Sequence, residues 1–95
     1  MYNLSEDIIQ GLVNVAVKHN IEKIVLFGSR AKGTNSRTSD IDLAVFGGNA
    51  AMFSLDIEEE VRTLLMFDVV DMSKNISAEL KSEIEKYGVV IYEKV

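Results

Sequence analysis

The chain has 95 residues, one histidine, no cysteine and a formal net charge of −5. This length fits a single domain covering residues 1–95, and a composition of 47% hydrophobic and 26% charged residues excludes a disordered or collagen-like chain. The lack of cysteine excludes disulfides and thiolate metal sites, so a metal would have to be held by oxygen ligands. Direct nucleic-acid binding is also disfavoured, because phosphates require a basic surface.

The charge is distributed unevenly along the chain. Residues 23–37 carry four basic residues and no acid, whereas residues 40–71 carry eight acids and one arginine. No apolar run approaches the roughly 18 residues that span a membrane. The first ten residues, MYNLSEDIIQ, lack the basic and apolar regions of a signal peptide. We therefore expect a cytoplasmic protein that does not enter a membrane.

The first half of the chain predicts a helix, a strand and a polar loop. Apolar residues recur at helical spacing over residues 4–19, and Asn3 or Ser5 is expected to cap this helix. Residues 21–27, IEKIVLF, are predicted to form a buried strand that stops at Gly28. The following stretch, GSRAKGTNSRTS, predicts a turn, one short helix through Ala31 and a loop.

The second half predicts three further strands and two helices. In residues 40–46, DIDLAVF, polar and apolar residues alternate, which predicts a strand with one exposed face. This alternation places Asp40 and Asp42 on the same side. Residues 51–65 predict an amphipathic helix with Leu55, Val61, Leu64 and Leu65 on its apolar face. A strand at 67–72, a helix at 76–87 and a strand at 89–92 follow. The fold class is therefore α/β (α+β), a small mixed sheet of about four strands covered by helices.

Two aspartates on one strand predict a metal site. Residues i and i+2 of a strand lie about 6.5–7 Å apart on one face, so the carboxylates of Asp40 and Asp42 can converge on cations that relieve their repulsion. Oxygen ligands favour Mg²⁺ or Mn²⁺. A third carboxylate is expected from a neighbouring strand, and FDVVDM offers Asp68 or Asp71.

A phosphate site is predicted beside these acids. Gly28 ends a buried strand and leaves room for a phosphate to approach the main chain, and Ser29 offers a hydroxyl and a backbone N–H. If a helix starts at residues 30–32, its free N–H groups attract anions. Arg30 and Lys32 are candidate phosphate contacts, with solvated surface charges as the alternative. Tyr87 and Tyr92 are assigned to the core rather than to stacking on a nucleobase.

These motifs resemble those of a known superfamily. GSRAKG followed by SDIDLAVF is similar to the signature of the DNA polymerase β-like nucleotidyltransferases, Gly-Ser and then Asp-x-Asp. Over nearly its full length the chain resembles the smallest members, the minimal nucleotidyltransferases (MNT), antitoxins of the MntA type in HEPN/MNT pairs. The resemblance implies the polymerase β palm-like nucleotidyltransferase fold.

The resemblance also implies roles for individual residues. Gly28 and Ser29 would grip the triphosphate, and Asp40 and Asp42 would bind the metals. The family's third acid lies in an apolar-Asp-apolar pattern that favours Asp68 over Asp71 as base or metal ligand. The loop NSRTS departs from the family because it lacks the proline and acids common before Ser-Asp. The absence of an added lobe leaves the choice of acceptor open.

The expected activity is metal-dependent transfer of AMP from ATP to an acceptor hydroxyl, with release of pyrophosphate. The resemblance implies that the acceptor is a tyrosine of a HEPN toxin and that this chain is its antitoxin. One alternative is a non-catalytic nucleotide-binding subunit that neutralises a partner by contact. A second is modification of a small molecule, as by aminoglycoside nucleotidyltransferases. An exposed apolar face would favour a homo- or hetero-oligomer.

Overall fold

Helices and strands alternate along residues 4–95, the part of the chain that this computed structural model describes. Their order is α1 (Glu6–Lys18), β1 (Lys23–Phe27), α2 (Ser29–Lys32), β2 (Ile41–Phe46), α3 (Ala50–Glu60), β3 (Phe67–Asp71), α4 (Ala78–Tyr87) and β4 (Val89–Glu93). The cap of α1 is Ser5, whose Oγ accepts from the backbone N–H of Ile8; Asn3 lies outside the described residues. Across residues 4–95, each helix is too short or too polar to cross a bilayer.

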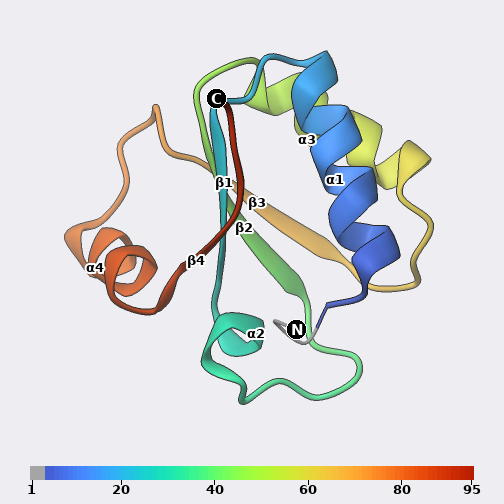
Figure 1. The fold of residues 1–95 in the computed structure, drawn as a ribbon. Coiled ribbons are helices and arrows are strands. Elements are labelled where there is room, and N and C mark those ends of the chain that lie inside the picture. Colours follow the sequence, from blue (N-terminus) through green and yellow to red (C-terminus); the bar gives the residue numbers. More distant parts are fainter. Residues whose placement is uncertain (1–3) are drawn as a thin grey trace.

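The strands form one mixed sheet in the order β3-β2-β1-β4 (Figure 1). Strand β1 runs antiparallel to both β2 and β4, whereas β2 and β3 are parallel. A parallel pair needs a crossover between its strands, and α3 lies in that crossover. This arrangement confirms the small mixed sheet of four strands covered by helices.

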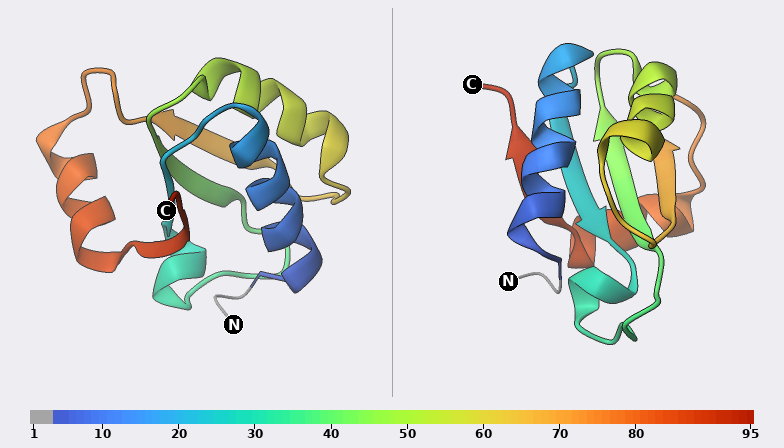
Figure 2. Two further views of the ribbon diagram at one scale, coloured as in Figure 1. Left: turned by 45° about the horizontal axis from the view of Figure 1, so that its top comes forward. Right: turned by 90° about the vertical axis from the view of Figure 1, so that its right-hand side faces the viewer.

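The two faces of the sheet are covered by different helices. One face packs against α1 and α3, and the largest buried side chains of that layer are Leu12, Ile21, Ile24, Leu26, Ile41, Leu43, Phe53 and Ile57. The opposite face packs against α4 through Val25, Phe27, Ala44 and Ile84. Figure 2 shows the sheet between α4 and the α1–α3 pair. The sheet therefore separates residues on the α4 side from the main hydrophobic core.

Helix α3 corrects the sequence prediction for residues 51–65. It ends at Glu60, and residues 61–66 lead to β3 without helical structure. Leu55 and Leu64, which were assigned to the apolar face, are 63% and 103% exposed. The buried row is Ala50, Phe53 and Ile57. Leu55 lies about 200° around the helix from Phe53, so only one of the two apolar rows can face the sheet.

Strand β2 is also more enclosed than its alternating sequence predicts. Ala44 lies on the same side as Asp42, yet it is fully buried because Ile84 of α4 packs in the same cluster. Asp42, nearer the start of the strand, is only partly buried. The expected exposed face is therefore restricted to the end of β2 that carries the aspartates.

Gly88 allows α4 to end directly against β1. A Cβ at this position would overlap the carbonyl oxygen of Ile84 and crowd a methyl group of Val25. We expect Gly88→Ala to destabilise the protein by roughly 1–3 kcal/mol, as overpacking does. Urea unfolding followed by circular dichroism measures this. Ser82→Ala, on the exposed side of the same helix, should change stability by less than about 0.5 kcal/mol. An unchanged midpoint for Gly88→Ala would show that α4 shifts without cost.

Candidate functional site

Asp42 is the centre of an acidic cluster at one end of the sheet. It is the second residue of β2 and lies directly opposite Asp68 in the parallel β2–β3 ladder. Neighbouring strands are about 4.8 Å apart, so the two carboxylates share one face at close range. Asp40 immediately precedes β2 and is exposed. The structure thus brings together the three aspartates that the sequence and the resemblance single out.

The electrostatics of Asp42 reflect this crowding. The pKa of its carboxyl is raised from 3.8 to about 6, mainly by burial and additionally by the negative charges of Asp68, Asp40 and Glu83. Asp68 also lies within hydrogen-bonding reach of Asp42. A raised pKa means that ionisation of the carboxyl is less favourable here than in water and destabilises the folded protein. A cation bound by the carboxylates would offset this destabilisation.

Gly28 lies against the Asp42 carboxylate. Its φ is +74°, in the region that favours glycine, and a Cβ there would overlap Oδ2 of Asp42. Ser29 follows as the first residue of α2. The register pairs Phe27, the last residue of β1, with Asp42. The predicted phosphate turn and the predicted metal ligands therefore lie side by side, because two antiparallel strands place the end of β1 beside the start of β2.

Arg30 has a structural environment that the sequence did not reveal. The residue is 5% exposed. Its Nε and Nη2 donate to the carbonyl oxygen of Ser39 at 3.1 and 3.0 Å, and Nη2 also donates to that of Arg37 at 3.3 Å. The guanidinium thus fixes the loop that leads into Asp40. This placement favours a role in holding the loop over the direct phosphate contact predicted for Arg30.

Lys32 is connected to α4. Its Nζ lies 3.0 Å from Oε1 of Glu83 and 5.0 Å from the ring centre of Tyr87. Tyr87 is 43% exposed, which corrects its assignment to the core, whereas Tyr92 packs against the core as expected. Sequence reasoning missed Glu83 as a member of this site. No local signal marks it, because its proximity to Asp42 depends on how α4 crosses the sheet.

Asp71 is placed differently from Asp68. It pairs in register with Val45, three positions further along the ladder, and its Oδ1 accepts hydrogen bonds from the backbone N–H and the hydroxyl of Ser73. These bonds lower the pKa of the Asp71 carboxyl. The side chain caps the turn after β3. The geometry therefore favours Asp68 as the third carboxylate.

The donor set suits a hard divalent cation that a nucleotide brings with it. Within residues 4–95, no three carboxylate or imidazole groups are arranged to hold an ion by themselves. Mg²⁺ is usually bound by one or two carboxylates together with substrate phosphates and water. The adjacent carboxylates of Asp42 and Asp68 and the neighbouring Gly28 turn fit that mode of binding.

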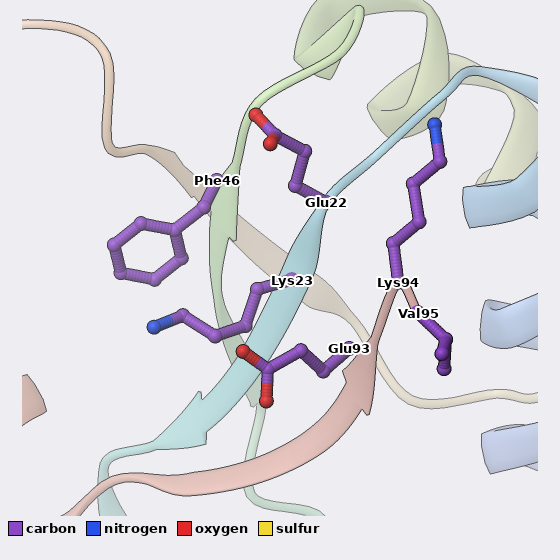
Figure 3. A pocket seen from close by; sticks show the side chains of 6 residues that line it. All are labelled: Glu22, Lys23, Phe46, Glu93, Lys94 and Val95. Carbon is purple, nitrogen blue, oxygen red and sulfur yellow. The ribbon is translucent and has the colours of Figure 1, made fainter.

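Two surface hollows lie away from the acids. The first, of about 500 Å³, is at the Lys23–Phe46 end of the β1–β2 ladder, four register positions from Phe27 and Asp42 (Figure 3). Its lining residues are Glu22, Lys23, Phe46, Glu93, Lys94 and Val95. The second, of about 450 Å³, lies between the start of α3 and the residues after β3. Neither hollow is lined by the aspartates of the site.

Comparisons with known proteins point in the same direction as this geometry. No curated protein matches the sequence significantly. A chain of a toxin–antitoxin crystal structure with AMP-PNP superposes with a TM-score of 0.72, at 21% identity over 90% of this chain and 73% of that one. A chain of a mutant of the toxin–antitoxin MntA-HpeT superposes with a TM-score of 0.68, at 24% identity over 96% and 74%. These similarities establish a shared fold.

The sequence itself matches a family profile. The family described as "Polymerase beta, Nucleotidyltransferase" matches residues 10–95. The matched region contains the Gly28 turn and all three aspartates of the cluster. The chain therefore belongs to the polymerase β nucleotidyltransferase family.

Proposed function

We propose that this chain transfers AMP from ATP to a hydroxyl group of a partner protein and releases pyrophosphate. The observation that carries the proposal is the position of Asp42, which has Gly28 against its carboxylate and Asp68 directly opposite. A phosphate bound at the turn would lie next to oxygen ligands for its cation. The structural neighbour that contains AMP-PNP supports an adenine nucleotide as donor.

Each residue of the site has a separate task in this proposal. Gly28 and Ser29 bind the triphosphate through the main chain and a hydroxyl, and Lys32 neutralises part of its charge. Asp42 and Asp40, with Asp68, would hold Mg²⁺ or Mn²⁺ together with the nucleotide. The bound cations would orient the triphosphate and stabilise the charge that develops on the leaving oxygen. Arg30 keeps the loop before Asp40 in place through the carbonyl oxygens of Arg37 and Ser39.

The transfer step is an in-line displacement at the α-phosphorus. The acceptor oxygen forms a bond to that phosphorus while the bond to the oxygen that bridges the α- and β-phosphates breaks. Pyrophosphate leaves with the bonding electron pair, and the acceptor proton passes to the carboxylate of Asp68. Asp68 suits this task because it is exposed at the edge strand of the sheet, where an acceptor can approach.

The acceptor in this proposal is a tyrosine of a HEPN toxin, with this chain as its antitoxin. Two observations support a macromolecular acceptor. Asp40 and Asp68 are exposed and line neither of the two hollows described above, and the structural neighbours come from toxin–antitoxin crystal structures. The competing function, neutralisation by contact with nucleotide as a structural ligand, predicts no covalent change in the partner.

Transfer of label tests the proposal. The protein is incubated with Mg²⁺, the product of the adjacent gene and ATP labelled at the α- or γ-phosphate. We expect α-label, but not γ-label, on the partner. Asp68→Asn should lower the rate about 10²–10⁴-fold, while Asp71→Asn, the same change on the same strand, should retain it. Absence of α-label with the wild-type protein, or equal transfer by Asp68→Asn, would contradict the proposal and favour neutralisation by contact.

A further inference from the structure

Glu83 forms an ion pair with the lysine that follows the phosphate turn, and its charge acts on the acidic cluster. Its Oε1 is 3.0 Å from Nζ of Lys32, and its charge contributes to the raised pKa of Asp42. Glu83 comes from α4, whereas Lys32 ends α2 and Asp42 lies on β2. The packing of α4 therefore puts a carboxylate on the lysine that is a candidate to neutralise a bound triphosphate.

A carboxylate beside a predicted phosphate site weakens the binding of anions there, so the presence of Glu83 requires an explanation. Asp40 and Asp68 already surround Asp42 with negative charge. Glu83 adds to this repulsion and also engages the ammonium group of Lys32. The guanidinium of Arg30 is directed to the carbonyl oxygens of the loop. A triphosphate without cations would thus meet a surface with excess negative charge and a lysine that is already paired.

We propose that Glu83 is a specificity-determining residue that pairs with Lys32 until a metal-bound triphosphate displaces it, so that the site selects metal-bound nucleotide over metal-free phosphate anions. This inference rests on the proposed function, because it assigns a role at the same site. Divalent cations held by the aspartates would offset the negative charge of the site, and Lys32 would then be able to move to the phosphates.

The side chains have the freedom that such an exchange needs. About a third of each remains exposed, 34% for Lys32 and 36% for Glu83. Partly exposed ion pairs are weak, and the four-carbon stem of the lysine side chain is flexible. The Lys32 ammonium also lies 5.0 Å from the ring of Tyr87. This cation–π contact is a second weak interaction that holds the lysine beside α4.

Titration calorimetry with ATP, in EDTA and in Mg²⁺, tests the inference on the full chain. The variants are Glu83→Gln, Lys32→Met and their combination. We expect Glu83→Gln to tighten binding of metal-free ATP about fivefold, the scale of a weak ion pair, and to reduce the ratio between the Kd values in EDTA and in Mg²⁺. In the Lys32→Met background the same change should have less than half of that effect. Glu85→Gln, an exposed residue of α4 with the same change in charge, is the control.

The outcomes separate this inference from the proposed function. Equal effects of Glu83→Gln and Glu85→Gln, or a gain that persists in full without Lys32, would overturn the role of Glu83 while leaving AMP transfer intact. Weaker ATP binding by Glu83→Gln would also overturn it, because the carboxylate would then be a ligand. A wild-type protein that binds no ATP under either condition would overturn both.

Discussion

Replacement of Asp42 by asparagine is expected to abolish AMP transfer and, at the same time, to stabilise the metal-free protein. The loss should be at least about 10³-fold in kcat, since the amide removes a charged ligand from the cation site. The expected gain in stability follows from the pKa of Asp42, which is raised from 3.8 to about 6. A shift of this size corresponds to about 3 kcal/mol, and solvent screening at this partly exposed carboxyl reduces the expectation to about 1 kcal/mol.

The stabilisation should depend on pH in a defined direction. The folded protein holds a proton on Asp42 between pH 3.8 and about 6, where the unfolded chain does not. The contribution of Asp42 to stability therefore falls as pH rises through this window and stays unfavourable above it. The difference between Asp42→Asn and the wild type should be near zero at pH 4 and reach about 4–8 °C in Tm at pH 7.

Thermal unfolding in EDTA at several pH values, together with the labelled-ATP assay, measures both effects. Asp71→Asn is the matched control, because the pKa of Asp71 is lowered by Ser73 and its replacement should not stabilise. Saturating Mg²⁺ with ATP should raise the Tm of the wild type and not that of Asp42→Asn. A destabilised Asp42→Asn would mean that the Asp42 carboxylate makes favourable contacts that outweigh its burial.

Much of the site could be predicted from the sequence because it depends on local rules. The period of two along a strand predicts Asp40 and Asp42 on one side, with Asp40 found just before the start of β2, and a glycine after an apolar run predicts the turn at Gly28. The pairing of Asp42 with Asp68 needed the strand order in addition. Family resemblance supplied the choice of Asp68, and the register agrees with it.

The remaining features depend on packing between distant elements. Helix α3 has two apolar rows, and only contact with the sheet decides that Phe53 rather than Leu55 is buried. The guanidinium of Arg30 and the carboxylate of Glu83 are likewise defined by partners elsewhere in the chain, 7–9 and 51 positions away. Such contacts leave no periodic signal, so charge and residue type alone could not separate a loop-holding arginine from a phosphate ligand.

Gly28→Ala is expected to damage both folding and nucleotide binding. The residue has φ +74° and ψ −154°, a backbone conformation essentially restricted to glycine, and the new Cβ would overlap Oδ2 of Asp42. Strain and overlap together should cost about 2–4 kcal/mol. Displacement of the turn from the aspartates should lower kcat/KM for ATP about 10²-fold, because small misplacements of reacting groups have effects of that size.

Two comparisons separate the backbone effect from the overlap with Asp42. Gly33→Ala introduces the same methyl group at φ +78° and ψ +18°, in the left-handed helical region, which is less strained for alanine than the conformation of Gly28, so it should cost only about 1 kcal/mol and retain ATP binding. In an Asp42→Ala background, Gly28→Ala should lose the overlap and destabilise by less than it does in the wild type. Urea unfolding of the four proteins of this cycle gives the coupling. A coupling of zero would mean that the Gly28 turn and the Asp42 carboxylate do not touch, and the shared phosphate and metal site would then lose its geometric basis.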